Sequence, residues 1–261
     1  MTDYIAPQDL LAGRTILVTG AGDGIGRAAA LAFAEHGATV ILLGRTMAKL
    51  EQTYDAIEAA GGPQPAIFPM NLDSAHQQEY QGLAVTMEQE FGHLDGLLHN
   101  AAELALLSRI DDYDLEIWNK VLRVNLTAPF LLTQVCLPLL RRSPDASILF
   151  TSDRVGRRGR AYWGAYGVSK FGLEGLMQIL SDETRDSSRI RVNSIAPGPT
   201  RTNLRAHAYP GEDPGRLPTA ESFMHLYLYL MGPDSQGVTG QAFDVADGRL
   251  SAAPVEDAVG S

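Results

Sequence analysis

Short runs of consecutive apolar residues alternate with longer amphipathic segments along this chain. The apolar runs predict β-strands at residues 15–18, 39–43, 66–70, 94–99, 147–150, 191–195 and 242–245. Apolar positions at helical spacing predict helices at residues 27–36, 47–60, 74–91, 115–142, 165–185 and 222–231. Pro129 and Pro138 are expected to kink or bound the longest of these helices. Because the strands are apolar on successive residues, helices must cover both faces of the sheet.

This order of elements predicts an α/β protein with a single doubly wound Rossmann domain. The domain would occupy residues 1–250, and its parallel sheet of seven strands would be flanked by helices. Residues 251–261 contain no aromatic side chain and are expected to form a mobile C-terminal tail. In such a fold, ligands bind at the carboxyl ends of the strands.

Composition narrows the class of protein. The chain has 261 residues and a net charge of −10, which argues against nucleic-acid binding. Cys136 is the single cysteine, so neither a disulfide within the chain nor a cysteine-ligated metal is expected. The N-terminus lacks the pattern of a signal peptide, and no uninterrupted apolar run reaches the length of a membrane span. We therefore expect a cytoplasmic protein that binds no membrane.

A glycine-rich turn follows the first predicted strand and opens a helix, in Thr19-Gly20-Ala21-Gly22-Asp23-Gly24-Ile25-Gly26. Glycines at 20, 24 and 26 allow a tight turn, close approach of the backbone to a pyrophosphate, and close packing of helix on strand. The helix N-terminus supplies amide groups for the anion. A glycine turn that only reverses the chain is the alternative, but the strand-then-helix context favours dinucleotide binding.

Arg45 follows the second predicted strand, where an acidic residue would favour NAD by binding the adenosine ribose hydroxyls. A guanidinium can instead pair with a 2′-phosphate, so NADP(H) is predicted in preference to NAD(H). The alternative is a solvated loop arginine.

Tyr166 and Lys170 are four residues apart on a predicted helix and therefore lie on the same face. An ammonium beside a phenol stabilises the phenolate, so Lys170 is expected to lower the pKa of Tyr166 from about 10. Such a pair suits proton transfer coupled to hydride chemistry.

With these features in order, the chain resembles the short-chain dehydrogenase/reductase family. The resemblance rests on the glycine turn, His99-Asn100-Ala101-Ala102, Asn125, Tyr166 with Lys170, and Pro197-Gly198-Pro199-Thr200-Arg201-Thr202. Within the family, four segments resemble the YciK-type bacterial oxidoreductases: Gln8-Asp9-Leu10-Leu11, Ile41-Leu42-Leu43-Gly44-Arg45, Gly156-Arg157-Arg158-Gly159-Arg160 with Trp163, and Leu226-Tyr227-Leu228-Tyr229-Leu230-Met231-Gly232.

The resemblance implies roles for individual residues. Tyr166 would be the general acid/base, Lys170 would bind the nicotinamide ribose, and Asn125 would hold a helix bend and a relay water. The implied cofactor contacts are Gly20, Gly22, Asp23, Gly24, Ile25, Gly26, Arg45, Asn71, Leu72, Asn100, Ala101, Lys170, Pro197, Gly198, Thr200 and Thr202. Asn71 stands where the family has Asp, and Ala102 where it has Gly.

Asp153 is the most consequential departure, because it occupies the position of the family's substrate-binding serine, thirteen residues before Tyr166. An ionised aspartate cannot donate a hydrogen bond, and its charge opposes a tyrosinate. A carboxylic acid kept protonated could donate. Ser152 could substitute only if the backbone bulged, since neighbouring strand residues face opposite sides.

Four arginines, at positions 154, 157, 158 and 160, follow Asp153 in an otherwise acidic chain. They suggest an anionic substrate, or neutralisation of Asp153, or a solvated loop or subunit contact.

These observations predict an NADP-dependent oxidoreductase that interconverts an alcohol and a carbonyl compound, with Asp153 among its catalytic residues. The alternative is a cofactor-binding relative with weak or no turnover, acting as a sensor or scaffold, because of Asp153. The resemblance also implies a homodimer or homotetramer paired through residues 127–142 and 165–182. The apolar Phe130-Leu131-Leu132 and the residues Phe171, Leu173 and Leu176 suit that contact.

Overall fold

An eight-stranded sheet forms the centre of the computed structural model, which describes residues 4–186, 189–246 and 249–252. The strand order is β3-β2-β1-β4-β5-β6-β7-β8. The strands are β1 (Thr15–Thr19), β2 (Thr39–Gly44), β3 (Ala66–Pro69), β4 (Gly96–His99), β5 (Ala146–Thr151), β6 (Ile190–Ala196), β7 (Ala242–Ala246) and β8 (Arg249–Ala252). All neighbouring strands pair in parallel except β7 and β8.

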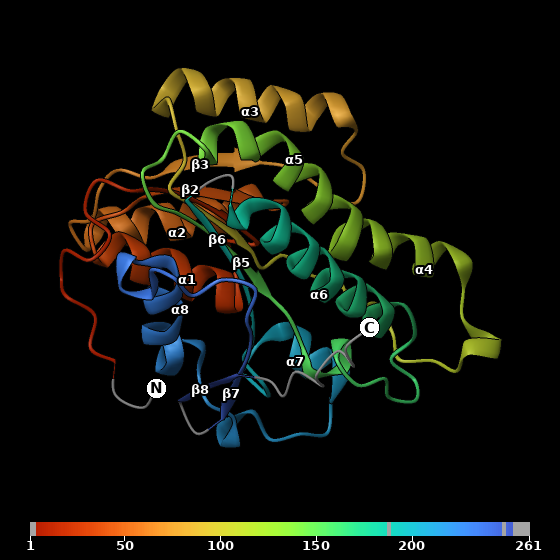
Figure 1. Ribbon diagram of the computed structural model, residues 1–261. Coiled ribbons are helices and arrows are strands. Elements are labelled where there is room, and N and C mark those ends of the chain that lie inside the picture. The colour runs from red at the N-terminus through yellow and green to blue at the C-terminus, as the bar shows by residue number, and fades with distance from the viewer. Residues whose placement is uncertain (1–3, 187–188, 247–248, 253–261) are drawn as a thin grey trace.

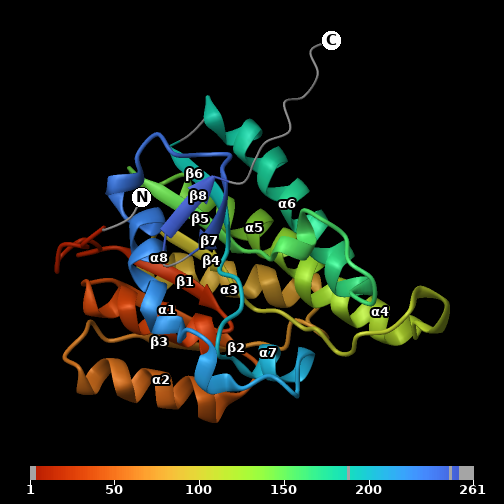
Figure 2. The same cartoon turned by 90° about the horizontal axis from the view of Figure 1, so that it is seen from below.

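Helices cover both faces of this sheet (Figures 1 and 2). One face carries α1 (Gly24–Glu35), α2 (Met47–Ala59) and α8 (Met224–Met231). The other carries α3 (Gln77–Phe91), α4 (Leu115–Leu122), α5 (Ala128–Leu140) and α6 (Gly164–Arg185). The short helix α7 (Asn203–Ala208) lies beyond the carboxyl end of β6.

The strands are apolar on successive residues because each one supplies both cores. In β1, Ile16 and Val18 belong to the core under α1 and α8, whereas Leu17 belongs to the core under α3, α5 and α6. All three side chains are fully buried. The predicted doubly wound α/β fold is confirmed.

The sheet differs from the prediction in its number of strands. Seven parallel strands were expected, and the structure adds β8, which pairs antiparallel with β7. Ser251 and Ala252, assigned from sequence to the mobile tail, are the last residues of β8, and the rest of that segment lies outside the described residues. A four-residue strand with one buried side chain, Leu250, leaves too short an apolar pattern to be recognised.

The long helical region is interrupted just before Pro129, one of the two prolines expected to kink or bound it, and α5 continues through Pro138. A π-helical turn (Arg123–Thr127) separates α4 from α5, Pro129 lies in the first turn of α5, and Pro138 lies within that helix. By length and composition alone, Leu115–Leu140 could span a membrane. Its contacts account for this apolar character, because α4 packs on α6 and α5 packs on α3.

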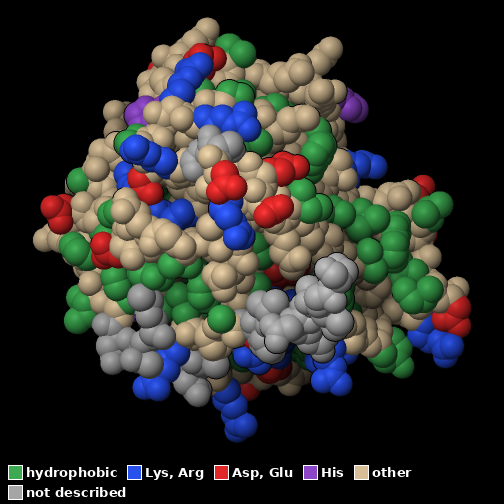
Figure 3. Space-filling model, in the orientation of Figure 1, with side chains coloured by type: hydrophobic (Ala, Val, Ile, Leu, Met, Phe, Trp, Pro, Cys, Tyr) green, Lys and Arg blue, Asp and Glu red, His purple; other side chains and the backbone are tan. Residues whose placement is uncertain are grey.

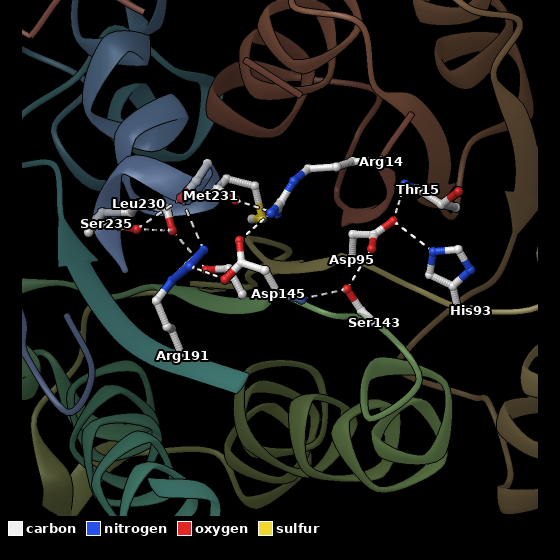
Figure 4. Close-up of polar contacts among 12 residues, drawn as sticks. Arg14, Thr15, His93, Asp95, Ser143, Asp145, Arg191, Leu230, Met231 and Ser235 are labelled. Carbon is white, nitrogen blue, oxygen red and sulfur yellow. Dashed lines mark hydrogen bonds and ion pairs between the residues drawn. The ribbon is translucent and has the colours of Figure 1, made fainter. Parts of the chain in front are cut away.

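Charged side chains join the strands at the amino edge of the sheet, opposite the carboxyl ends (Figure 4). The Asp145 carboxylate accepts hydrogen bonds from Arg14 and, at 2.5 Å, from Arg191. Arg191 also donates to the carbonyl of Gly232 at 3.0 Å, and burial lowers its pKa. One carboxylate thus balances two guanidinium groups that connect β1, β5, β6 and the end of α8.

We predict that Asp145→Ala lowers the free energy of unfolding by about 3–5 kcal/mol, because it leaves two largely buried cations without a counter-charge. Urea unfolding followed by circular dichroism measures the loss. Asp111→Ala is the control, since Asp111 and its partner Arg109 are exposed and such pairs contribute at most about 1 kcal/mol. Equal losses in the two variants would contradict the assigned importance of Asp145.

Candidate active site

A cavity of about 700 Å³ opens at the carboxyl edge of the sheet. It is lined by nearly all the residues expected from sequence: Gly20, Gly22, Asp23, Gly24, Ile25, Arg45, Asn71, Leu72, Asn100, Ala101, Asp153, Tyr166, Lys170, Pro197, Gly198, Thr200 and Thr202. Gly26 and Asn125 lie outside this lining, and each is next to or in contact with a residue that belongs to it. The glycine turn and the Tyr166–Lys170 pair therefore belong to a single site.

The glycine turn is shaped by close backbone packing. Gly20 has a φ of +70° and Gly24 a φ of +50°, values that L side chains rarely adopt. A Cβ on Gly26 would lie 2.3 Å from the carbonyl oxygen of Gly20 and 2.5 Å from the amide nitrogen of the Asn100 side chain. Gly26 thus lets α1 approach the turn and the loop after β4.

Asp23 caps α1 and connects three segments around the turn. Its carboxylate accepts hydrogen bonds from the Gly24 amide at 2.8 Å, from Lys49 Nζ at 2.5 Å and from the Asn203 side chain at 2.8 Å. Thr19, which no sequence motif marks, also supports the turn. Its hydroxyl accepts from the amides of Asn100 and Ala101, at 2.9 and 3.0 Å, and so fixes the loop after β4 against β1.

Arg45 lies at one end of the cavity with its side chain 67 % exposed. Its guanidinium is 3.5 Å from a carboxylate oxygen of Glu103, a residue that the sequence analysis did not single out. Lys120 approaches the same oxygen at 3.2 Å. No sequence motif marks Glu103, because its importance comes from three elements that meet only in the fold.

Tyr166 and Lys170 are buried at the other end, where 4 % and 3 % of their surfaces are exposed. The Tyr166 hydroxyl donates to Asp153 Oδ2 at 3.4 Å. Lys170 donates to the carbonyl of Thr151 at 2.7 Å, and its ammonium lies 5.6 Å from the centroid of the Tyr166 ring. The expected juxtaposition of phenol, ammonium and Asp153 is present.

The pKa of the Tyr166 phenol is raised and not lowered. Burial raises it well above 10, and both the charge of Asp153 and the hydrogen bond to it raise it further. Lys170 was expected to lower this pKa, but it directs its ammonium to the Thr151 carbonyl. The rise caused by Asp153 agrees with the effect expected of its charge. Burial also lowers the pKa of Lys170 to about 8, while Asp153 and Glu174 oppose that shift.

Asn125 lies in the π-helical turn, outside the cavity lining, and connects two segments beside the cavity. Its side chain accepts from the amide of Glu103 at 2.7 Å and donates to the carbonyl of the same residue at 2.8 Å. It also donates to the Ser169 hydroxyl at 3.0 Å, next to Lys170 in the chain. The side chain therefore joins the loop after β4 to the helix that carries the Tyr166–Lys170 pair.

The arginines after Asp153 have separate contacts. Arg157 pairs with Glu174 at 3.0 Å and Asp244 at 2.7 Å, and Arg154 lies 3.7 Å from Asp244. Within the described ranges, no arginine forms an ion pair with Asp153, so the neutralisation considered from sequence is not what the structure shows. Both Asp153 oxygens have partners, the Tyr166 hydroxyl at 3.4 Å and the Val155 amide at 3.0 Å.

Apolar and aromatic side chains form the wall beside Tyr166. Trp163 stacks at a tilt on Tyr166, with centroids 5.4 Å apart, and lies 6.2 Å from the ring of Tyr209. Arg160 lines the same part of the cavity and donates to the Tyr209 hydroxyl at 3.2 Å. The buried Ser152 hydroxyl also belongs to the lining and has no hydrogen-bond partner among the described residues.

Comparison with known proteins identifies the class to which this fold and site belong. A family model described as short chain dehydrogenase matches residues 14–213, so the chain belongs to the short-chain dehydrogenase/reductase family. The uncharacterized oxidoreductase YciK of Escherichia coli is 49% identical over 246 residues, which cover 94% of this chain and 97% of YciK. The recognition made from sequence is confirmed.

Solved structures agree with this assignment. A short chain dehydrogenase from Pseudomonas syringae is 56% identical, with a TM-score of 0.92 over 94% of this chain and 99% of that one. A short chain dehydrogenase from Shigella flexneri, solved in complex with NADP, is 49% identical, with a TM-score of 0.89 over 91% of this chain and 99% of its own. The chain is thus a member of an oxidoreductase family that acts on small molecules.

We predict that Gly26→Ala destabilises the protein by about 1–3 kcal/mol, since the new methyl group would overlap backbone that has no space to move. NADPH binding, measured by fluorescence titration, should weaken as the turn is displaced. Gly82→Ala in α3 is the matched control, because a Cβ at Gly82 meets no atom within 4 Å. Unchanged thermal stability and NADPH affinity in Gly26→Ala would show that the turn tolerates a side chain there.

Proposed function

We propose that this protein is an NADP(H)-dependent oxidoreductase that interconverts an alcohol and a carbonyl compound. The observation that carries the proposal is the single cavity that joins the glycine turn and Arg45 to the buried Tyr166–Lys170 pair. A dinucleotide cradle without a proton donor would only bind, and a buried phenol without the cradle would have no redox partner.

The residues present fit a dinucleotide. The glycine turn leaves backbone space that a Cβ would fill, and Arg45 offers an exposed guanidinium at the rim of the cavity. Under this proposal the turn holds the pyrophosphate, with Gly20, Gly22, Asp23, Gly24 and Ile25 at its surface. The remaining contacts are those expected from the family: Asn71, Leu72, Asn100, Ala101, Lys170, Pro197, Gly198, Thr200 and Thr202. When bound, the cofactor supplies or accepts hydride at its nicotinamide ring.

Tyr166 moves the proton in this proposal. Its raised pKa keeps the phenol neutral near pH 7, so it can donate to the oxygen of a carbonyl compound as that oxygen gains negative charge. The reverse reaction needs the tyrosinate to accept the alcohol proton, and burial and Asp153 both disfavour that anion. Near pH 7 Tyr166 is therefore in the form that can protonate a carbonyl oxygen, and the form that accepts an alcohol proton is scarce.

Asp153 also supports a second function, a cofactor-binding relative with weak or no turnover that senses redox state or serves as a scaffold. The Asp153 carboxylate accepts the hydrogen bond of the Tyr166 hydroxyl, which a substrate carbonyl would otherwise receive. Measuring NADPH binding and carbonyl reduction on one sample separates the two functions, because the second predicts binding without reduction.

The substrate end of the cavity suits a carbonyl compound with an apolar or aromatic body. Trp163 and Tyr209 provide ring surfaces, and the guanidinium of Arg160 could bind an anionic group at the far end of the substrate. A panel of aromatic ketones and aldehydes, with and without a carboxylate, tests this substrate class.

We predict that Tyr166→Phe lowers kcat for carbonyl reduction by about 10²–10⁴-fold while NADPH binding is retained, because only the proton donor is removed. Steady-state kinetics at 340 nm and fluorescence titration measure the two quantities. Tyr162→Phe is the control, since Tyr162 is 58% exposed and lies outside the cavity lining. Parental turnover in Tyr166→Phe would rule out Tyr166 as the general acid.

The charge of Asp153 makes a second prediction, about pH dependence. Alcohol oxidation requires the tyrosinate, so its rate should be low near neutrality and rise into alkali. Asp153→Ser removes a negative charge beside the phenol, which lowers the pKa of Tyr166 and shifts the oxidation profile to lower pH by about 1–3 units. Asp153→Asn also removes the charge but keeps a side chain of the same shape that can accept a hydrogen bond. Comparing the two variants therefore separates the effect of the charge from that of the hydrogen bond. Superimposable profiles for the parent and both variants would exclude Asp153 from the mechanism.

The protein is also proposed to assemble as a homodimer or homotetramer through α5 and α6. Phe130, Val168, Phe171 and Ile179 are each between 44% and 60% exposed on these helices. Hydrophobic side chains gather on this side of the molecule (Figure 3). Leu132 and Leu173, which the sequence analysis placed on that surface, are buried in the protein's own core.

We predict a light-scattering mass of two or four times the 28.2 kDa of the chain at micromolar concentration. Phe171→Glu should shift the distribution towards the monomer, because a charge in an apolar contact is costly. Val85→Glu, at a 52% exposed position on α3, is the control. A monomeric parent protein would contradict the assembly.

A further inference from the structure

Glu103 places a carboxylate at the end of the cavity where Arg45 is proposed to receive a 2′-phosphate. Its Oε2 atom lies 3.5 Å from Arg45 and 3.2 Å from Lys120. Arg45 follows β2, Glu103 follows β4, and Lys120 belongs to α4, so three separate segments bring these charges together. Both Arg45 and Glu103 line the cavity.

Glu103 is held in place more firmly than its partner Arg45. Its backbone amide and carbonyl are both hydrogen-bonded to the side chain of Asn125, and its second carboxylate oxygen accepts from the Ala105 amide at 3.3 Å. The Glu103 side chain is 20% exposed, whereas that of Arg45 is 67% exposed. A ligand that draws Arg45 away would move the arginine and leave the carboxylate where it is.

We propose that Glu103 is a specificity-determining residue that competes with the 2′-phosphate of NADP(H) for Arg45. The inference rests on the proposed function. A phosphate on Arg45 must displace the carboxylate or share the guanidinium with it, and the two anions then repel each other. NAD(H) has no 2′-phosphate and meets no such competition. Arg45 makes the protein bind NADP(H) more tightly than NAD(H), and Glu103 reduces that difference in affinity.

Lys120 moderates this competition. It pairs with the same oxygen of Glu103, so it continues to neutralise the carboxylate when Arg45 turns to a phosphate. Removing the ammonium should strengthen the repulsion that a phosphate meets. Lys120→Met is accordingly expected to weaken NADPH binding without a comparable effect on NADH.

The test is a set of dissociation constants for NADPH and NADH, measured by fluorescence titration at low salt. Glu103→Gln should tighten NADPH about three- to fivefold, the range of an exposed ion pair, and leave NADH within about twofold. Arg45→Ala should weaken NADPH alone. In the Arg45→Ala background, Glu103→Gln should have little effect on the NADPH-to-NADH ratio, because the competition acts through the guanidinium. Glu88→Gln, which removes one carboxylate from an exposed pair with Arg142, is the control for net charge.

Three results would overturn the inference. Weaker NADH binding in Glu103→Gln would show that the carboxylate instead accepts hydrogen bonds from the ribose hydroxyls. Equal tightening of both cofactors, or an effect that persists without Arg45, would show that the competition does not pass through that guanidinium. A parent protein that binds NADPH but reduces no carbonyl compound contradicts the proposed function and leaves these affinity comparisons valid.

Discussion

The burial of the Lys170 ammonium against the end of β5 is the constraint on which the site depends. A charged group with 3 % of its surface exposed needs a close partner, and the Thr151 carbonyl provides one at 2.7 Å. This contact fixes the first turns of α6 to the carboxyl edge of the sheet. Tyr166, one helical turn earlier, is thereby held beside Asp153, and the aromatic wall packs around it.

The same burial sets the protonation state that Tyr166 prefers. Removing the phenol from water favours its neutral form, and the adjacent carboxylate adds to that preference. A site with a serine in place of Asp153 would lack this negative charge. The chain thus has the fold of its family, and the surroundings of Tyr166 favour the neutral phenol over the tyrosinate.

Much of this arrangement can be predicted from the sequence because it follows from local rules. Successive apolar residues in β1 and β2 indicate strands buried on both faces, and the glycines after β1 indicate a turn that opens a helix. The placement of Asp153 near Tyr166 is implied by the resemblance to the family, whose serine stands at that position. Local rules fail where partners are distant in the chain. Glu103 acquires its role from Arg45 and Lys120, and Arg157 is occupied by Glu174 and Asp244 rather than by its neighbour Asp153. The lowering of the Tyr166 pKa expected from Lys170 is not found, because burial depends on the whole fold, whereas the rise expected from the charge of Asp153 is found.

The central claim is that one cavity brings a hydride carrier and the Tyr166 proton donor to the same substrate carbon and oxygen. The most direct measurement is transfer of deuterium from NADPH labelled at the reactive C4 position to a panel of aromatic ketones and aldehydes, followed by mass spectrometry. The account predicts deuterium on the carbinol carbon of at least one product, in proportion to the NADPH consumed. NADPH that binds, as judged by fluorescence, but delivers no deuterium to any member of the panel would contradict it.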